Sequence, residues 1–205
     1  MQALVHQSRA PGSPYRVVRV ISDQPAAAGL ALARDLGVTA QALPANRLPG
    51  RAAYDRLLAE AIDECTPALI VLAGFMRILS PEFVDRYAGR ILNIHPSLLP
   101  KYPGLHTHGR ALESHDCVHG ATVHFVTAEL DGGPRIVQAR VAVQPGDDEA
   151  ALAARVQAEE HHIYPLAVDW FCTGRLTCRD GRAWLDGVAL SEPVVYGAAA
   201  PQAGH

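Results

Sequence analysis

Residues 68–95 read ALIVLAGFMRILSPEFVDRYAGRILNIH, and this stretch decides the fold. It opens with the continuous apolar run Ala68–Ala73, which is typical of a strand buried on both faces of a parallel sheet. Ser80-Pro81-Glu82 predicts a helix start, because a capping hydroxyl precedes a proline at the first helical position and an acid near the positive dipole end. Arg90–His95 predicts a second strand. Strand, helix and strand in this order indicate an α/β fold with parallel strands.

The residues before this stretch show the same alternation. Arg16–Ser22 is a short β-branched run that predicts a strand, and Pro25–Gly37 predicts a helix, with Gly37 just past its end. A second helix is indicated by one apolar stripe at helical spacing, which Thr66-Pro67 ends. The residues of the stripe are Tyr54, Leu57, Leu58, Ala61, Ile62 and Cys65.

The second half of the chain predicts antiparallel pairing. Ala121–Val126 and Ile136–Val143 are two expected strands, and the turn signal Asp131-Gly132-Gly133 lies between them. A long helix follows over Asp147–Phe171, with Pro165 expected to bend it. We therefore expect an α/β fold with a mostly parallel central sheet and an antiparallel C-terminal part.

The end of the chain predicts a hairpin and then a tail. Asp180-Gly181 is a hairpin turn signal between short strands within residues 176–185. Gly197–His205 is small and polar, and residues 190–205 are expected to form a flexible tail. No linker separates the two halves, so we expect one domain over residues 1–205.

Composition excludes several classes of function. The 205 residues carry 18 Lys and Arg against 21 Asp and Glu, a formal charge of −3. Such a balance argues against a dedicated binder of nucleic acid or of a membrane surface. Met1–Gly12 lacks the apolar segment of a secretory signal, and the run Ala68–Met76 falls far short of the roughly 20 residues that span a bilayer. The four scattered cysteines fit reduced thiols in a cytoplasm.

Polar side chains close the predicted strand Arg90–His95. Asn93 and His95 are two residues apart, so they project from the same face while Ile94 points into the core. Ligands of open α/β sheets bind at the carboxyl ends of strands, where an amide and an imidazole can contact one carbonyl oxygen. The alternative is a pair of polar residues that simply closes a strand. The proline-containing loop Ser97–Gly104 that follows fits either a functional loop or a rigid turn.

Asp131 is the third candidate. In a turn flanked by glycines it is either an ordinary turn residue or a carboxylate that meets His95 across a cleft, where it would favour the charged imidazole. His124 is either a core residue or part of the site. His106 and His108 suit a surface pair better than a metal site, because they do not share a helix face. The polar run Glu159–His162 suits a solvated helix face.

Three longer segments carry a resemblance to a known family. Val71–Pro81, Leu92–Thr107 and His119–Pro134 together resemble the phosphoribosylglycinamide formyltransferase family, and the similarity continues through Ala153–Pro165. The resemblance implies a Rossmann-like formyltransferase fold with helices on both faces of the sheet. It also implies formyl transfer from 10-formyltetrahydrofolate, a co-substrate, to the amine of 5-phosphoribosylglycinamide in purine biosynthesis. No metal is implied, the partners are small molecules, and a monomer or homodimer is expected.

The resemblance also assigns site residues. The catalytic residues are Asn93, His95 and Asp131. The folate site comprises Arg51, Met76, Arg77, Ile78, Leu79, Asn93, Thr127, Ala128, Glu129, Leu130 and Asp131. The acceptor contacts are Gln157, Ala158, Glu159 and Glu160.

The chemistry of these side chains agrees with formyl transfer. Attack of a neutral amine on a formyl carbon builds a tetrahedral oxyanion, and the Asn93 amide with a protonated His95 would be donors for that oxygen. His95 would supply the proton that the expelled folate nitrogen needs, and Asp131 would orient the imidazole. The sequence contains no Gly-x-Gly-x-x-Gly, Walker or serine-nucleophile motif that would favour another chemistry.

The beginning of the chain departs from the family pattern. The family starts with a strand and a Gly/Ser/Asn-rich loop that holds the acceptor phosphate, whereas Met1–Val5 resembles the inside of the helix that follows that loop. From the sequence we expect either that the true start lies upstream of Met1 or that the chain is an N-terminally truncated form. If it begins at Met1, we expect weak acceptor binding and low stability. Two alternative functions are a formyltetrahydrofolate deformylase, in which water replaces the amine, and a non-catalytic folate-binding remnant.

Overall fold

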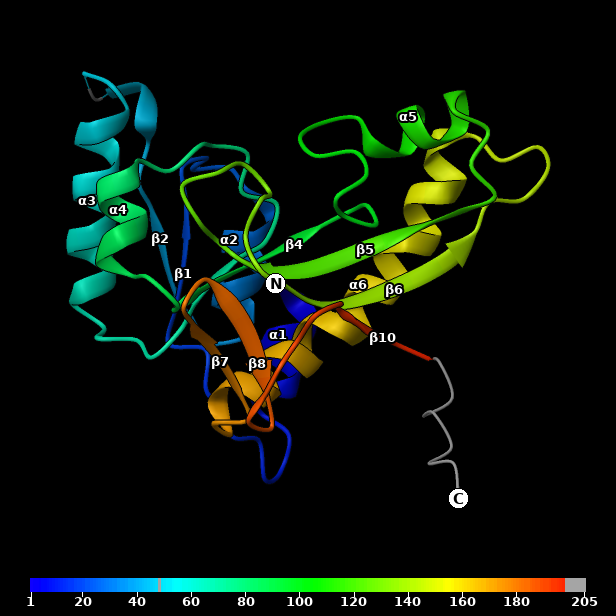
Figure 1. Cartoon of the computed structure of the whole chain (residues 1–205). Coiled ribbons are helices and arrows are strands. Elements are labelled where there is room, and N and C mark those ends of the chain that lie inside the picture. Colours follow the sequence, from blue (N-terminus) through cyan, green and yellow to red (C-terminus); the bar gives the residue numbers. More distant parts are fainter. Residues whose placement is uncertain (48, 198–205) are drawn as a thin grey trace.

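The computed structural model describes residues 1–47 and 49–197 (Figure 1). The first half comprises α1 (Gln2–Gln7), β1 (Arg19–Ser22), α2 (Ala28–Asp35), β2 (Thr39–Ala42), a 3₁₀ turn (Ala45–Arg47), α3 (Arg51–Asp63), β3 (Ile70–Leu72), α4 (Pro81–Arg86) and β4 (Ile91–His95). The second half comprises α5 (Thr107–Glu113), β5 (Val118–Phe125), β6 (Arg135–Ala142), α6 (Glu149–Cys172), β7 (Leu176–Arg179), β8 (Arg182–Leu185), β9 (Val188–Ala189) and β10 (Val194–Val195).

The strands form parallel and antiparallel pairs, as the α/β expectation required. A five-stranded sheet has the order β10-β6-β5-β4-β3, in which β3 and β4 are parallel while β4, β5 and β6 are antiparallel neighbours. The pairs β1·β2 and β6·β10 are parallel, and β7, β8 and β9 form an antiparallel meander. The mixed α/β fold is therefore confirmed.

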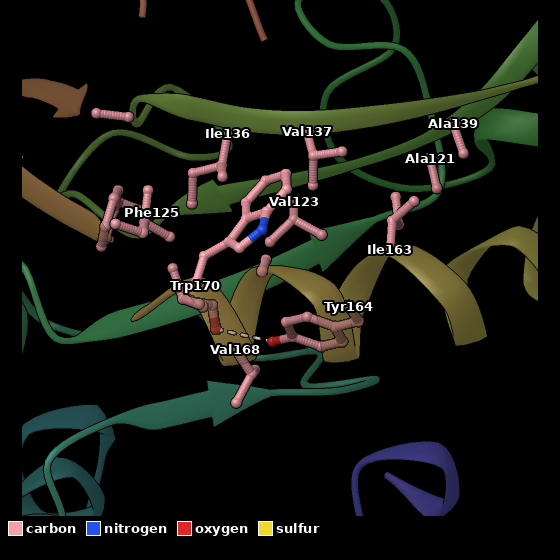
Figure 2. Close-up of a cluster of buried hydrophobic side chains, with 14 of the residues drawn as sticks. Ala121, Val123, Phe125, Ile136, Val137, Ala139, Ile163, Tyr164, Val168 and Trp170 are labelled. Atoms are coloured by element: carbon pink, nitrogen blue, oxygen red, sulfur yellow. Dashed lines mark hydrogen bonds between the residues drawn. The ribbon is translucent and has the colours of Figure 1, made fainter. Parts of the chain in front are cut away.

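Helices pack on both sides of β4. Neighbouring strand residues point to opposite faces, so they contact different helices. Ile91 is buried among α3 and α4, whereas Leu92 belongs to the core formed with α6. Figure 2 shows this second core, where Trp170 of α6 lies against β5 and β6. The Tyr164 hydroxyl donates to the carbonyls of Leu72 and Leu92, at 2.6 and 3.0 Å, and so joins α6 to β3 and β4.

Local signals in the sequence explain where several elements begin and end. The Ser80 hydroxyl accepts a hydrogen bond from the Phe83 amide at the start of α4, so the predicted cap is confirmed. Gly37 has a φ of +62° just after α2, a conformation that costs glycine little. Helix α6 begins at an Asp148 cap and continues through Pro165.

The prediction that Ala68–Ala73 is buried on both faces is wrong, because the strand is less buried than expected. The strand β3 forms within this run, but its three residues are only half-buried. The physical reason is its position: β3 pairs with β4 alone and lies at one edge of the five-stranded sheet. An apolar run identifies a strand, but its exposure depends on what lies beside it.

The C-terminal elements follow the predicted hairpin. The strands β7 and β8 pair around Asp180-Gly181, where both residues have positive φ. Within the tail expected to be flexible, Val194 and Val195 pair with β6. Residues 198–205 lie outside the described part of the chain, so flexibility there stays a prediction.

Candidate active site

The strand β4 presents two polar side chains on one face near its carboxyl end. Asn93 and His95 lie on the face of Ile91, while Ile94 packs against the opposite core with Leu92. The His95 side chain is 7% exposed, so it is almost completely withdrawn from solvent. A buried imidazole needs hydrogen-bonding partners, and these come from two loops.

The first loop spans Ser97–Gly104 and is called the 97–104 loop below. The Tyr102 carbonyl lies 2.8 Å from Nε2 of His95. A carbonyl oxygen only accepts, so Nε2 carries the proton of this bond and the neutral ring has its lone pair on Nδ1. The same loop donates the Gly104 amide to Oδ2 of Asp131 at 2.8 Å. One loop therefore orients both an imidazole and a carboxylate.

The second loop is the turn between β5 and β6, which carries Asp131. The structure brings this carboxylate to His95, with Oδ2 3.5 Å from Nδ1. Its other oxygen, Oδ1, lies 3.7 Å from Nε2 of His124. Asp131 has a φ of +51°, a left-handed conformation that aspartate tolerates in turns. The side chain is 8% exposed, so the surrounding water screens its charge weakly.

His124 completes the site as a neighbour of Asn93. The two are register partners on β5 and β4, and Nδ2 of Asn93 lies 3.2 Å from Nε2 of His124. The Phe125 carbonyl lies 2.8 Å from Nδ1, so Nδ1 donates there and Nε2 accepts from the Asn93 amide. Burial lowers the pKa of His124, against the opposing effects of the Phe125 carbonyl and Asp131, which favours this neutral ring. From the sequence, His124 could be either a core residue or part of the site. The register of β4 with β5 places it beside Asn93.

A pocket beside this cluster collects most of the residues expected to contact folate. Its lining contains both apolar and polar residues: Leu72, Phe75, Arg77, Ile78, Leu79, Val84, Asn93, His124, Val126, Thr127, Ala128, Glu129, Leu130 and Asp131. Met76, which is 78% exposed, and Arg51, the first residue of α3, are not among the lining residues. The pocket therefore joins the segments 77–79 and 127–131 to Asn93.

Arg77 links this pocket to a second, more polar hollow. Its guanidinium lies 4.5 Å from the centre of the Tyr54 ring and 3.7 Å from the Asp23 carboxylate. The second hollow lies where the chain leaves β1 and β2, and it is lined by Asp23, Gln24, Pro25, Pro44, Ala45, Asn46 and Arg77. No pattern in the sequence points to this hollow, because its polar residues follow no known spacing.

The expected acceptor contacts lie on α6, away from the lining of either pocket. Gln157 and Ala158 are exposed, whereas Glu159 and Glu160 are half-buried. Burial raises the pKa of the Glu160 carboxyl.

Within residues 1–47 and 49–197, no three histidine, cysteine or acidic side chains gather in a way that could hold a metal ion. Within the same residues, no helix has both the length and the apolar character needed to cross a membrane.

Comparisons with known proteins identify the family to which this chain belongs. The formyl transferase family model matches residues 1–168. The chain is 54% identical over 190 residues to phosphoribosylglycinamide formyltransferase of Escherichia coli, covering 93% of this chain and 90% of the relative. The solved phosphoribosylglycinamide formyltransferase of Coxiella burnetii superposes with a TM-score of 0.90 at 41% identity, over 95% of this chain and 92% of that chain. A formyltetrahydrofolate deformylase from Burkholderia mallei reaches a TM-score of 0.80 at 28% identity, over 90% and 64%. The chain therefore belongs to the formyl transferase family.

Proposed function

We propose that this chain transfers the formyl group of 10-formyltetrahydrofolate to the amine of 5-phosphoribosylglycinamide. The products are formylglycinamide ribonucleotide and tetrahydrofolate, and the step belongs to purine biosynthesis. The proposal is supported by the name of the Escherichia coli relative and by the site chemistry. The single observation that carries it is the approach of the Asp131 carboxylate to Nδ1 of His95, beside a pocket that Asn93 and Asp131 line.

In the proposed first step, the amine nitrogen of the acceptor attacks the formyl carbon and the carbonyl oxygen becomes an oxyanion. Asn93 has two N–H groups on Nδ2, of which one is directed to His124 and the other is free for this oxygen. Protonated His95 donates from Nδ1, because its Nε2–H is held by the Tyr102 carbonyl. Two preorganised donors in a buried site stabilise a developing charge far more than they would in water.

In the proposed second step, the bond between the carbon and the folate nitrogen breaks, and that nitrogen takes a proton. His95 is the donor, and the proton is replaced by the one that the attacking ammonium loses, so the protons balance. Asp131 stabilises the imidazolium, since its carboxylate faces Nδ1 at 3.5 Å.

The pocket is proposed to hold the folate, with Arg77, Ile78, Leu79 and residues 127–131 around its ring system. Such a site, in which apolar side chains stand beside several polar and charged ones, suits a flat heteroaromatic ligand with polar edges. Arg51 and Met76 are proposed to contact more distant parts of the folate. Residues 157–160 of α6 are proposed to contact the acceptor, as the resemblance to the family implies, and they lie within the part of the chain that the family model matches.

Hydrolysis of the same formyl donor is the second candidate, because water can replace the amine at the same three side chains. The deformylase relative supports it at 28% identity, and the chain spans 64% of that protein. The 54% identity to the transferase over nine-tenths of both chains favours transfer.

The two candidates are separated by one assay, run with and without 5-phosphoribosylglycinamide. Release of tetrahydrofolate that depends on the acceptor supports the transferase, and it should disappear in the His95→Ala variant. Release of formate without acceptor would show a hydrolase. Retained folate binding without any release would show a non-catalytic binding protein.

We further propose a cytoplasmic enzyme that acts as a monomer or homodimer. Its four cysteines, all in the described part of the chain, are free thiols, as a reducing compartment requires. Its proposed substrates are small and soluble. Analytical ultracentrifugation of the purified chain measures the oligomeric state directly.

A further inference from the structure

A row of three polar residues crosses the sheet beneath the 97–104 loop. His95 on β4 is the register partner of Thr122 on β5, and Thr122 is the register partner of Gln138 on β6. Register partners project from the same face of a sheet, so all three side chains face the loop. Thr122 is completely buried, and Gln138 is 6% exposed. These two are not among the residues to which the proposed chemistry gives a role.

The two inner members of the row bind the backbone where the loop begins. The Thr122 hydroxyl donates to the Ser97 carbonyl at 2.6 Å and accepts from the Leu99 amide at 3.1 Å. The Gln138 amide nitrogen donates to the Leu99 carbonyl at 2.8 Å and to the Thr122 hydroxyl at 3.0 Å. We call these four bonds the Thr122–Gln138 bracket.

The bracket uses the whole bonding capacity of one hydroxyl. A threonine oxygen has one proton to donate and two lone pairs, and here the proton and both lone pairs are engaged. Loss of that oxygen would leave the buried Leu99 amide without a partner, which is costly in a site closed to water. Serine retains all three bonds, whereas valine of the same shape retains none.

The bracket holds the start of the loop, and the loop's far end carries the contacts to the site. Tyr102 supplies the carbonyl that fixes Nε2 of His95, and Gly104 supplies the amide that binds Asp131. Other side-chain ties of the loop come from the Ser97 hydroxyl to the Lys101 and Tyr102 carbonyls, from Arg110 to the Pro103 carbonyl and from Arg135 to the Leu99 carbonyl. Lys101 and Tyr102 also contact Asp116, and the Lys101 side chain there is 60% exposed. Exposed ion pairs hold a loop weakly, so the buried bracket is a stronger anchor than the Lys101–Asp116 pair.

We propose that Thr122 and Gln138 are positioning residues for the formyl transfer. Through the backbone of Ser97 and Leu99, they hold the 97–104 loop where the Tyr102 carbonyl keeps the Nε2–H tautomer of His95 and leaves Nδ1 facing Asp131. The inference rests on the role proposed for His95, and the test is arranged so that the two can fail separately.

The test compares Thr122→Val, which removes the hydroxyl, with Thr122→Ser, which keeps it. We expect Thr122→Val to lower kcat about tenfold or more, because small misplacements of a catalytic group are costly. The KM values for both substrates should change by less than about twofold, and Thr122→Ser should restore kcat to within about twofold of the parent.

Gln138→Met should cause a smaller loss of kcat than Thr122→Val, because Arg135 also donates to the Leu99 carbonyl. Gln144→Met, on an exposed glutamine, is the matched control.

A spectroscopic measurement of the His95 tautomer tests the proposal independently of enzyme activity. The ¹⁵N chemical shifts of neutral His95 should report the Nε2–H tautomer in the parent and in Thr122→Ser, and a mixture of tautomers in Thr122→Val. Circular dichroism checks that each variant is folded; if Thr122→Val is not, Gln138→Met carries the same two readouts.

Three results would overturn the proposal. The first is an unchanged kcat and an unchanged His95 tautomer in folded Thr122→Val, or in Gln138→Met where Thr122→Val does not fold. The second is an equal loss of kcat in Thr122→Val and Thr122→Ser. The third is a rise in KM with no change in kcat. If the parent transfers no formyl group, the proposed function fails, while the tautomer comparison still decides whether the bracket positions His95.

Discussion

Oδ2 of Asp131 lies 3.5 Å from Nδ1 of His95, the imidazole nitrogen that the 97–104 loop leaves free. The carboxylate receives the Gly104 amide on the same oxygen, so its orientation does not depend on the imidazole. Charge and orientation can therefore be separated by substitution.

The Asp131→Asn variant should lose most of the turnover while the fold survives. An asparagine oxygen still accepts from Gly104, but the charge that stabilises the His95 imidazolium is gone. We expect kcat to fall by about a hundredfold or more, the usual contribution of a positioned general acid. Steady-state kinetics measure the loss, and a thermal melt checks the fold. Asp186→Asn, in an exposed ion pair with Arg175, should leave kcat unchanged. Turnover near the parent rate in Asp131→Asn would remove this assignment.

The Asn93→Ala variant should lose one of the two proposed oxyanion donors. Loss of such a donor costs about 10²–10³ in kcat, and binding of the folate should change much less. The matched variant Asn93→Asp replaces the donor with a charged acceptor beside Asp131 and should be at least as impaired. Presteady-state mixing separates the chemical step from folate binding. A similar kcat in parent and Asn93→Ala would show that the amide only closes the strand.

Stability should fall as the pH is lowered, and His119 should account for a measurable part of the fall. Burial, with the neighbouring His108, lowers the pKa of His119 to about 4, against the opposing charge of Asp116. Between its ordinary value and about pH 4, the unfolded chain therefore binds a proton that the folded chain does not. The free energy of unfolding then declines by up to about 1.4 kcal/mol per pH unit for this proton.

The measurement is urea unfolding at about pH 7 and about pH 5, in the parent and in His119→Gln. The parent should lose more stability than the variant over this interval. The pKa values of His108 and His124 are also lowered by burial, so both proteins share that part of the decline. Equal losses in parent and variant would contradict the prediction.

Two glycines should respond in opposite ways to alanine. A Cβ at Gly120 would lie 1.9 Å from the Ala139 carbonyl oxygen, a backbone atom of the neighbouring strand, so Gly120→Ala should destabilise the protein by about 1–3 kcal/mol or more. A Cβ at Gly109 meets only the end of the Glu149 side chain at 3.5 Å, and alanine favours the helix by about 0.5–1 kcal/mol. Thermal melts of both variants measure the difference, and equal effects would contradict it.

The sequence predicted the features of the fold and of the site that depend on one element at a time. The cap at Ser80 and the shared face of Asn93 and His95 follow from helix and strand geometry alone. The proximity of Asp131 to His95 could be stated only as one of two alternatives, because spacing along the chain does not determine how a turn lies against a strand.

Contacts made by backbone atoms escaped prediction for a different reason. The Tyr102 carbonyl and the Gly104 amide are present in any residue, so no side-chain pattern points to them. His124 needed the register of β4 with β5, and the half-burial of β3 needed the complete strand order. Patterns of residue type predict which face of a strand or helix is polar and where each element ends. The register between distant strands determines which of these faces and ends lie next to each other.

The acceptor that fixes His95 belongs to the main chain at a residue with a φ of +56°. Replacing the phenol of Tyr102 removes its hydrogen bond to Asp116, but the carbonyl oxygen stays part of the chain. An insertion or deletion in the 97–104 loop would displace that oxygen, so the length of the loop bears directly on the tautomer of His95.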